Sequence, residues 1–402
     1  YKLFLIFDLL KNSLSFYKIF STFKLVYFFL TKKDTKYPSY LVKYENKISI
    51  LNNKKYTLSF SSGTQAFESL MKSLDVKNKK IGVCNIVFPS IFRLLTRYFS
   101  IENLQILTCN KDLVLDLEKN YNEIKNLDYL LLTFSFGYPY HRELINKIFS
   151  INSKIKLIYD LSHSQGYSEK NIERHMQIHY FFSTQGSKAI STGEGGVVST
   201  DDLSIYKKMI FNSHLNRSDN KLNLSDKENL AVKIGVLSKS RMSPLGAISG
   251  TNDIFYLKKN NRLLRKKTFT IYDNLSKIDN IYFPKINNFE ELTGFHYGIP
   301  FIINYELTDV QKVNLLTLMK KYFRISKYNW LSTSNLKKLT QQQNLDKFEN
   351  YDFDFLDQDQ DYTNDKIFEN LYFIDLNFIK ILPNRFIKTL AKKLFLSIIN
   401  NK

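Results

Sequence analysis

The sequence predicts an α/β fold in which a mostly parallel sheet is covered on both faces by helices. Short apolar segments alternate with helix-like segments about every 25 residues, as repeated βαβ units do. Most of these segments are continuously apolar, which is typical of strands buried on both faces. The expected strands lie in KKIGVCNIVF (79–88), LQILTCN (104–110), YLLLTFSFG (129–137), IKLIYDLS (155–162), HYFFST (179–184) and GGVVST (195–200).

The pattern changes after about residue 250, in a chain of 402 residues that is long enough for a large domain and a smaller one. KKNNRLLRKK (258–267) predicts a charged helix and HYGIPFIIN (296–304) a strand, while FIDLNFIKILP (373–383) precedes a basic helix. The polar, acidic residues 339–365 predict a long surface loop. We therefore expect an N-terminal helical extension (1–35), a large domain (36–250) and a small C-terminal α/β domain (251–402).

The chain is strongly basic, with 58 Lys and Arg against 38 Asp and Glu and a net charge of +20. Such charge attracts anionic partners, including nucleotides, phosphates and membrane surfaces. The lysines are scattered, however, which favours a composition bias with solvated side chains. No nucleic-acid-binding module is present. Cys84 and Cys109 lack metal-site spacing and are too few for a disulfide framework, which favours a reducing cytoplasm.

A phosphate-binding turn is predicted in SSGTQAFESLMKSL (61–74), where Ser62, Gly63 and Thr64 precede a helix of apolar periodicity. The backbone N–H groups and the dipole at the start of a helix favour a bound anion. The same three residues also suit an ordinary helix cap.

An acidic residue follows a hydrophobic strand in IYDLSHSQG (158–166). Asp160 would then lie at the carboxyl edge of the sheet, where ligands bind in open α/β folds. There it could keep a pyridine nitrogen protonated, which makes the ring a better electron sink. A helix cap or a core aspartate is the alternative, and His163 is either a ring contact or a core histidine.

One lysine stands in a loop of small residues, FFSTQGSKAISTGEGGVVSTDD (181–202). A loop at the end of a strand can project the Lys188 amine into a cleft. Apolar surroundings would remove its hydration, lower its pKa and make it nucleophilic. The alternative is a solvated surface lysine. Phe88, before Pro89 at another strand end, suits either stacking on a planar cofactor or a place in the core.

The order of these motifs resembles the DegT/DnrJ/StrS family of pyridoxal phosphate (PLP)-dependent sugar aminotransferases, which have the fold-type-I architecture. The resemblance covers residues 38–250, and its most specific part is Lys188 followed by Thr192-Gly193-Glu194-Gly195-Gly196. Before the turn, KYPSYLVKYENKISILNNKKY (36–56) resembles the family's opening helix. Beyond residue 250, only the general layout and HYGIPF (296–301) are similar.

The resemblance implies roles for individual residues. Lys188 would hold PLP as a Schiff base, and Asp160 would pair with the pyridine nitrogen. The other cofactor contacts would be Ser62, Gly63, Thr64, Phe88, His163, Ser183 and Lys239. Arg241, in SRMSPLGAISG (240–250), and His296 would face the substrate. The arginine segment typically reaches the neighbouring subunit's site, which implies a homodimer.

The sequence departs from the family at several positions. His163 replaces a glutamine, Phe134 a histidine and Lys239 an asparagine. Pro244 and Gly246 stand where the family prefers helix formers. These departures bear on the substrate and the dimer contact more than on the cofactor.

The reaction implied by the resemblance is transfer of an amino group, with glutamate as donor, to a keto sugar linked to a nucleotide. Such chemistry serves amino-sugar or surface-glycan biosynthesis in the cytoplasm, or at the inner face of the membrane. One alternative is a PLP-dependent sugar dehydratase, in which histidine typically replaces the lysine. Another is a non-catalytic binding or regulatory protein that keeps the fold.

Residues 1–31 are apolar and aromatic apart from a polar stripe of Asp8, Lys11, Ser15, Lys18 and Thr22, spaced for one side of a helix. No run of 18 apolar residues and no cleavage motif is present, which argues against a spanning helix or a signal peptide. The stripe is narrow for an interfacial membrane helix, which favours burial against the domain or a dimer partner.

Liposome flotation of the full chain and of a truncation from residue 35 tests the two interpretations of residues 1–31. We expect equal flotation if the segment packs against protein. Flotation of the full chain alone would instead establish peripheral membrane contact.

Overall fold

The computed structural model describes most of the predicted large domain and parts of the C-terminal region. The described residues are 23, 26, 31, 39–138, 140–167, 175–214, 217, 224–234, 239–286, 297–328, 366–375, 379–380 and 382–399. The predicted helix over 1–31, apart from three residues, the acidic segment 339–365 and His296 lie outside them.

Seven strands form one sheet in the order β1-β7-β6-β5-β4-β2-β3. Their bounds are β1 Tyr56–Phe60, β2 Ile81–Cys84, β3 Leu104–Leu107, β4 Tyr129–Thr133, β5 Lys156–Asp160, β6 Ile178–Ser183 and β7 Gly196–Thr200. β2 pairs in parallel with β3 and β4, whereas β7 runs antiparallel to β1 and β6. The sheet is mostly parallel, so the predicted fold class is confirmed.

Each of the six predicted apolar segments contains one strand, but β1 was not anticipated. Its sequence, YTLSF, carries polar residues at positions that the fold buries. The hydroxyls of Thr57 and Ser199 lie 2.8 Å apart, and the Ser59 hydroxyl donates to Glu45 at 2.7 Å. Partners far along the chain therefore make this polar strand stable, and local periodicity could not show them.

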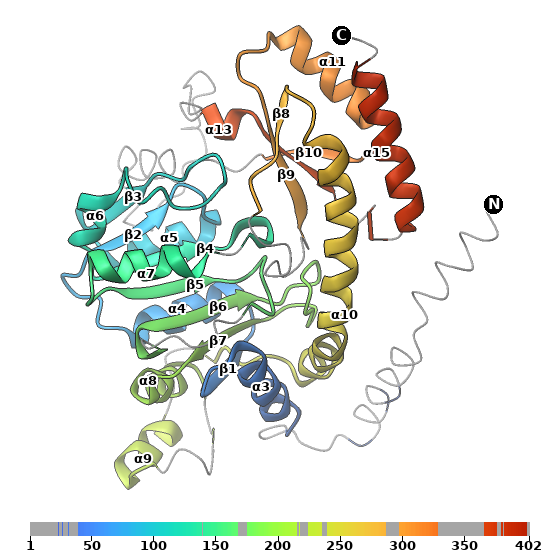
Figure 1. Ribbon diagram of the computed structural model, residues 1–402. Coiled ribbons are helices and arrows are strands. Elements are labelled where there is room, and N and C mark those ends of the chain that lie inside the picture. The colour runs from blue at the N-terminus through green and yellow to red at the C-terminus, as the bar shows by residue number, and fades with distance from the viewer. Residues whose placement is uncertain are drawn as a thin grey trace, which may run out of the picture. The chain divides into compact units, whose positions relative to one another are not determined.

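The first compact unit consists of residues 1–75 and 160–261. Its helices are α3 (Ser39–Asn52), α4 (Gly63–Ser73), α8 (Leu203–Ser213), α9 (Asp226–Ile234) and the first part of α10 (Pro244–Leu275). In Figure 1, α3 lies beside β1, and α4 packs against β6 and β7. Most of the buried side chains of α4 are apolar, and the ring of Phe67 contacts that of Phe181 on β6.

Two buried ion pairs connect residues of the N-terminal part of this unit, Glu45 and Lys54, with residues that follow β7, Arg217 and Asp201. The Arg217 guanidinium donates to both carboxylate oxygens of Glu45, at 3.2 and 2.8 Å. The Lys54 ammonium donates to Asp201 at 2.9 Å. Because a buried charge without its partner is costly, loss of one partner from either pair should destabilise this part of the unit.

The second compact unit consists of residues 76–159 and 262–402. Its helices are α5 (Pro89–Tyr98), α6 (Tyr121–Lys125), α7 (Arg142–Ile151), α11 (Asp309–Lys320), α13 (Lys366–Glu369) and α15 (Asn384–Ile399), with short 3₁₀ turns η1 (Ile101–Asn103) and η2 (Ser135–Gly137). A third such turn, η3 (His175–Gln177), belongs to the first unit. α11 and α15 lie side by side (Figure 1).

The C-terminal region of the second unit contains a separate four-stranded sheet in the order β10-β11-β9-β8. Its strands are β8 Ile281–Tyr282, β9 Gly298–Ile303, β10 Ile325–Lys327 and β11 Leu371–Asp375. The predicted strand at 296–304 and the predicted C-terminal helix are confirmed, and the predicted helix at 258–267 is part of the longer α10. The predicted boundary at residue 250 falls within this continuous helix and stays a prediction.

None of the helices in the described ranges combines the length and the apolar character needed to cross a lipid bilayer.

Removal of Glu45 should strongly destabilise the first unit. Glu45→Ala leaves the Arg217 guanidinium buried without a carboxylate to balance its charge, and we expect a loss of about 3–5 kcal/mol in the free energy of unfolding. Urea denaturation measures it. Lys207→Ala, which breaks the more exposed pair with Glu228, is the matched control and should cost far less. Equal losses for the two variants would contradict the structural importance of the buried pair.

Candidate active site

A buried carboxylate lies at the end of β5. The side chain of Asp160 accepts hydrogen bonds from the N–H of Ser162, at 2.9 Å, and from its hydroxyl. Burial raises the pKa of Asp160 above its ordinary value, while the Ser162 hydrogen bonds and the charge of Lys188 partly oppose this shift. Such a group is suited to receive a positively charged N–H donor, which would stabilise its ionised form.

The segment after Asp160 is joined to the end of β6. The N–H of Leu161 donates to the Phe181 carbonyl at 2.9 Å, and the N–H of Ser183 donates to the Ser162 hydroxyl oxygen at 3.0 Å. Ser162 therefore contacts both Asp160 and Ser183. These hydrogen bonds fix the carboxylate beside the strand from which the lysine loop leaves.

The loop that carries Lys188 is closed at its base by paired threonines. The Thr192 N–H donates to the Thr184 carbonyl at 2.8 Å, their hydroxyls lie 2.7 Å apart, and the Thr184 N–H donates to the Gly195 carbonyl at 2.8 Å. Burial lowers the pKa of Lys188 below its ordinary value, and Asp160 acts in the opposite direction. The net result is a larger fraction of neutral, nucleophilic amine at neutral pH.

The predicted phosphate turn lies against the ends of β6 and β7. Ser62 caps α4 by accepting from the Gln65 N–H at 3.1 Å, so the helix begins at Gly63. A Cβ atom on Gly63 would lie 2.7 Å from the Ser183 Cβ, and one on Gly196 would lie 2.2 Å from the Ser62 carbonyl oxygen. Glycine at both positions permits this close approach, which brings Ser62, Gly63 and Ser183 together. Hydroxyls and first-turn N–H groups form a suitable cradle for a phosphate.

The segment with Lys239 and Arg241 lies next to this turn. The N–H of Ser61 donates to the Ser240 carbonyl at 2.7 Å, and Arg241 forms an isolated β-bridge with Phe60. Lys239 is exposed and Arg241 is partly exposed. Two cationic side chains therefore stand on the segment that pairs with the approach to the phosphate turn, which supports anion binding there.

The two unusual residues at the start of α10 have a structural explanation. Pro244 is the first residue of α10, where its missing N–H has no helical partner to lose. A Cβ atom on Gly246 would lie 2.7 Å from the Thr192 carbonyl oxygen. Glycine thus lets α10 approach the base of the Lys188 loop more closely than a better helix former would.

Other predicted site residues lie in different surroundings. Phe88 belongs to the second unit, where it is the N-cap residue of α5 and its side chain is 43% exposed. Phe134 is buried against Tyr140 and Tyr159, with ring centroids 5.0 and 4.9 Å apart, so it is a core residue. His163 is partly buried in the loop after Asp160. Contacts of Phe88, His163 and the undescribed His296 with a ligand stay predictions.

Sequence reasoning missed three residues around the site. Gln165 is buried and bonds to the lysine loop, and the Asp253 carboxylate accepts from the Ser191 N–H at 2.8 Å. His214 is buried, and burial together with the charges of Arg217 and Arg241 lowers its pKa well below the ordinary value, so its ring is neutral. Gln165 lies in the predicted segment 158–166, but no local spacing indicated a role for any of the three residues, and only the folded arrangement shows what they contact.

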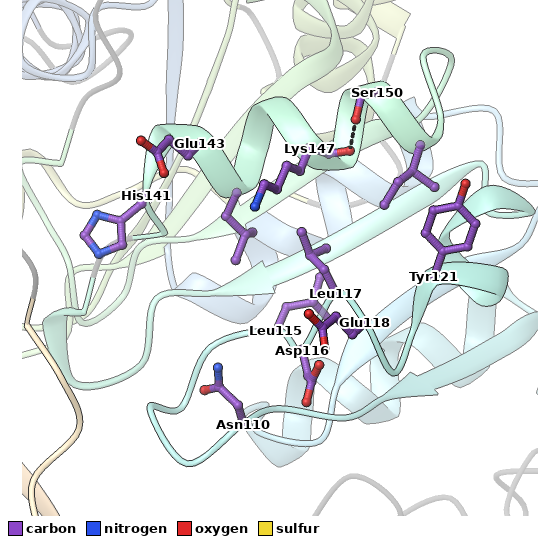
Figure 2. A pocket seen from close by; sticks show the side chains of 12 residues that line it. Asn110, Leu115, Asp116, Leu117, Glu118, Tyr121, His141, Glu143, Lys147 and Ser150 are labelled. Atoms are coloured by element: carbon purple, nitrogen blue, oxygen red, sulfur yellow. Dashed lines mark hydrogen bonds between the residues drawn. The ribbon is translucent and has the colours of Figure 1, made fainter.

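A groove of about 670 Å³ also occurs on the second unit, between α7 and the loop that precedes α6. Figure 2 shows His141 at one end and Tyr121 at the other, with Lys147 between them on α7. Its lining mixes acidic, basic and apolar side chains and includes none of the predicted site residues. Within the described ranges, no group of histidine, cysteine and acidic residues could hold a metal ion.

The lowered pKa of Lys188 can be measured in the cofactor-free protein. We expect an amine-reactive reagent to label Lys188 at a lower pH than the exposed lysines of the same digest, as followed by peptide mass spectrometry. Asp160→Asn removes the charge that stabilises the ammonium form, so labelling should shift to still lower pH. A labelling midpoint at or above that of the exposed lysines would contradict the assignment.

The family model of the DegT/DnrJ/EryC1/StrS aminotransferase family matches residues 131–347, which is more than half of the chain. No curated protein matches the sequence. Similar solved structures include an E. coli GDP-4-keto-6-deoxy-D-mannose-3-dehydratase with bound hydrated PLP, with a TM-score of 0.70, 18% identity, and coverage of 92% of this chain and 96% of that one.

Two further similar structures have names that describe aminotransferases. Helicobacter pylori PseC, involved in the biosynthesis of pseudoaminic acid, has a TM-score of 0.66 and 17% identity over 92% of this chain and 94% of its own. The putative sugar aminotransferase Spr1654 from Streptococcus pneumoniae, in its PMP form, has a TM-score of 0.67 and 16% identity over 93% and 97%. Identities this low indicate a shared fold. Together with the family match, the fold and the order of the site motifs lead to one conclusion: the chain belongs to the DegT/DnrJ/EryC1/StrS aminotransferase family.

Proposed function

We propose that this protein is a PLP-dependent aminotransferase that moves an amino group, with glutamate as donor, onto a keto sugar linked to a nucleotide. The observation that carries the proposal is a lysine of lowered pKa, Lys188, whose charge interacts with the buried carboxylate of Asp160. PLP bound there would supply an electron sink for negative charge that develops on the substrate's reacting carbon.

Lys188 has two tasks in the proposed reaction. Its neutral amine attaches the cofactor covalently, and the lowered pKa favours this step at neutral pH. When an amino donor displaces it, the same amine lies free to move a proton at the reacting carbon. The hydrogen bonds at the base of its loop keep the amine within reach during both tasks.

Asp160 and the phosphate turn orient the cofactor. The Asp160 carboxylate would receive the protonated ring nitrogen, whose positive charge would offset the effect of burial on the pKa of Asp160. Ser62, Gly63, Thr64 and Ser183 would hold the phosphate. A carboxylate and a set of hydroxyl and N–H donors would together orient the cofactor.

The sugar substrate is proposed to bind near Arg241, with a second subunit contributing to the site. Arg241 suits the phosphates of a nucleotide-linked sugar, Lys239 suits the cofactor phosphate, and the net positive charge favours such a substrate. His163 and Phe88 are proposed to contact the cofactor ring, and His296 the substrate. We also propose a homodimer, which light scattering coupled to size-exclusion chromatography tests, since a monomeric mass would exclude it.

A sugar dehydratase is the second candidate, since similar structures include the E. coli enzyme. Such enzymes share the fold, but in that branch the lysine is typically a histidine. Retention of Lys188 therefore favours amine transfer.

Reaction with glutamate tests the proposal. Protein supplied with PLP should show the visible absorbance of lysine-bound cofactor, and glutamate should bleach it while 2-oxoglutarate accumulates. Lys188→Ala should remove the band and lower amine transfer to a keto sugar nucleotide by at least about 100-fold. Lys208→Ala, at an exposed position on α8, is the matched control and should leave both unchanged.

The remaining outcomes separate the alternatives. A bound cofactor that responds to no amino donor would favour a non-catalytic binding protein. Loss of water from the sugar without net amine transfer would favour the dehydratase. An identical lack of absorbance in the wild type and in Lys188→Ala would overturn the cofactor assignment.

A further inference from the structure

A buried glutamine crosses between the two flanks of the lysine loop. The Gln165 side chain, 1% exposed, donates through Nε2 to the Ser183 carbonyl at 2.6 Å and to the Ile190 carbonyl at 3.4 Å. Its Oε1 accepts from the Ile190 N–H. Ser183 precedes the loop and Ile190 stands two residues after Lys188, so one side chain holds both flanks.

The amide of Gln165 satisfies this set of backbone groups by itself. The carbonyl oxygens of Ser183 and Ile190 each accept a hydrogen bond, and the Ile190 N–H donates one. The planar amide of Gln165 supplies both the donor and the acceptor. A hydrocarbon side chain of similar size would leave all three backbone groups without this partner. The chain then turns away at Gly166, whose φ of +92° lies in the left-handed region.

The rest of the loop is held unequally. The Asp253 carboxylate of α10 fixes Ser191, the residue next to Ile190. The tip, Gln185 to Ser187, is exposed, and the Gln185 side chain accepts from the N–H and hydroxyl of Ser187 within the loop itself. Lys188 therefore lies between the exposed tip, residues 185–187, and Ile190, whose backbone is hydrogen-bonded to Gln165.

We infer that Gln165 is a positioning residue that fixes the backbone of the Lys188 loop relative to Asp160. Gln165 and Asp160 belong to one short segment, and that segment also holds Ser183 through Ser162. A movement of the loop away from Gln165 would carry the amine away from the carboxylate. The chemical consequence of this inference rests on the proposed function, whereas its structural content does not.

Hydrogen–deuterium exchange of the cofactor-free protein tests the structural content. Gln165→Met keeps the size and removes all three hydrogen bonds, so the amides of residues 185–192 should exchange at least about tenfold faster, the factor expected from the net loss of a single hydrogen bond. Gln105→Met, at a polar contact on β3, is the control and should leave the loop unchanged. Loop exchange within twofold of the wild type, or an equal rise throughout β6, β7 and α4, would overturn the inference.

Gln165→Glu provides a conservative rescue, including the case in which the methionine variant does not fold. A protonated carboxyl can still donate to the Ser183 carbonyl and accept from the Ile190 N–H, whereas an ionised one cannot donate to the Ser183 carbonyl. Protection of the loop, corrected for intrinsic exchange, should therefore be near wild type at low pH and fall as the pH rises. Protection without this pH dependence would contradict the positioning role.

A spectrum separates this inference from the proposed function. With PLP added, Gln165→Met should show a shifted midpoint in the pH titration of the lysine-bound band, because the amine no longer keeps its place beside Asp160. An unshifted midpoint with faster loop exchange would reject the effect on the lysine. Absence of any band in the wild type, with the exchange result intact, would reject the proposed function and leave the loop clamp standing.

Discussion

The site depends on a carboxylate that the fold keeps away from water. Burial of an ionised group is unfavourable unless hydrogen bonds or opposite charges compensate for it. At Asp160 the compensation comes from the N–H and hydroxyl of Ser162 and from the charge of Lys188. Each of the two groups opposes the effect of burial on the pKa of the other. Asp160 favours the ammonium form of Lys188, and Lys188 favours the ionised carboxylate of Asp160. A cationic ring nitrogen would satisfy the carboxylate and release the lysine from this role.

Close approach of backbone segments gives this electrostatic arrangement its geometry. α4 begins against the ends of β6 and β7 because Gly63 and Gly196 carry no Cβ, and α10 reaches the lysine loop because Gly246 carries none. Each of these glycines faces a neighbour that a methyl group would strike. The phosphate turn and the lysine loop are thus parts of one packed unit, and hydrogen bonds from Gln165 and Asp253 hold the loop within it.

Much of the fold and of the candidate site follows from local sequence. Continuous apolar segments predicted six strands of the main sheet, because each such pattern lies within a few adjacent residues. Asp160 and Lys188 were predicted in the same way, each from its own short segment, and in the folded protein their charges interact. Strand β1 was not predicted from the sequence because the partners of its polar residues Thr57 and Ser59 lie elsewhere in the chain. Gln165 was missed for the same reason: its partners are Ser183, at the end of β6, and Ile190, in the lysine loop, and no spacing rule connects them.

The proposed chemistry requires that the cofactor attach to one lysine among many, Lys188. Incubation with PLP, borohydride reduction, digestion and peptide mass spectrometry identify the lysine that is modified. We expect a single pyridoxyl phosphate on the peptide that contains Lys188, with labelling lost in Lys188→Ala. Label distributed over exposed lysines and absent from Lys188 would contradict it.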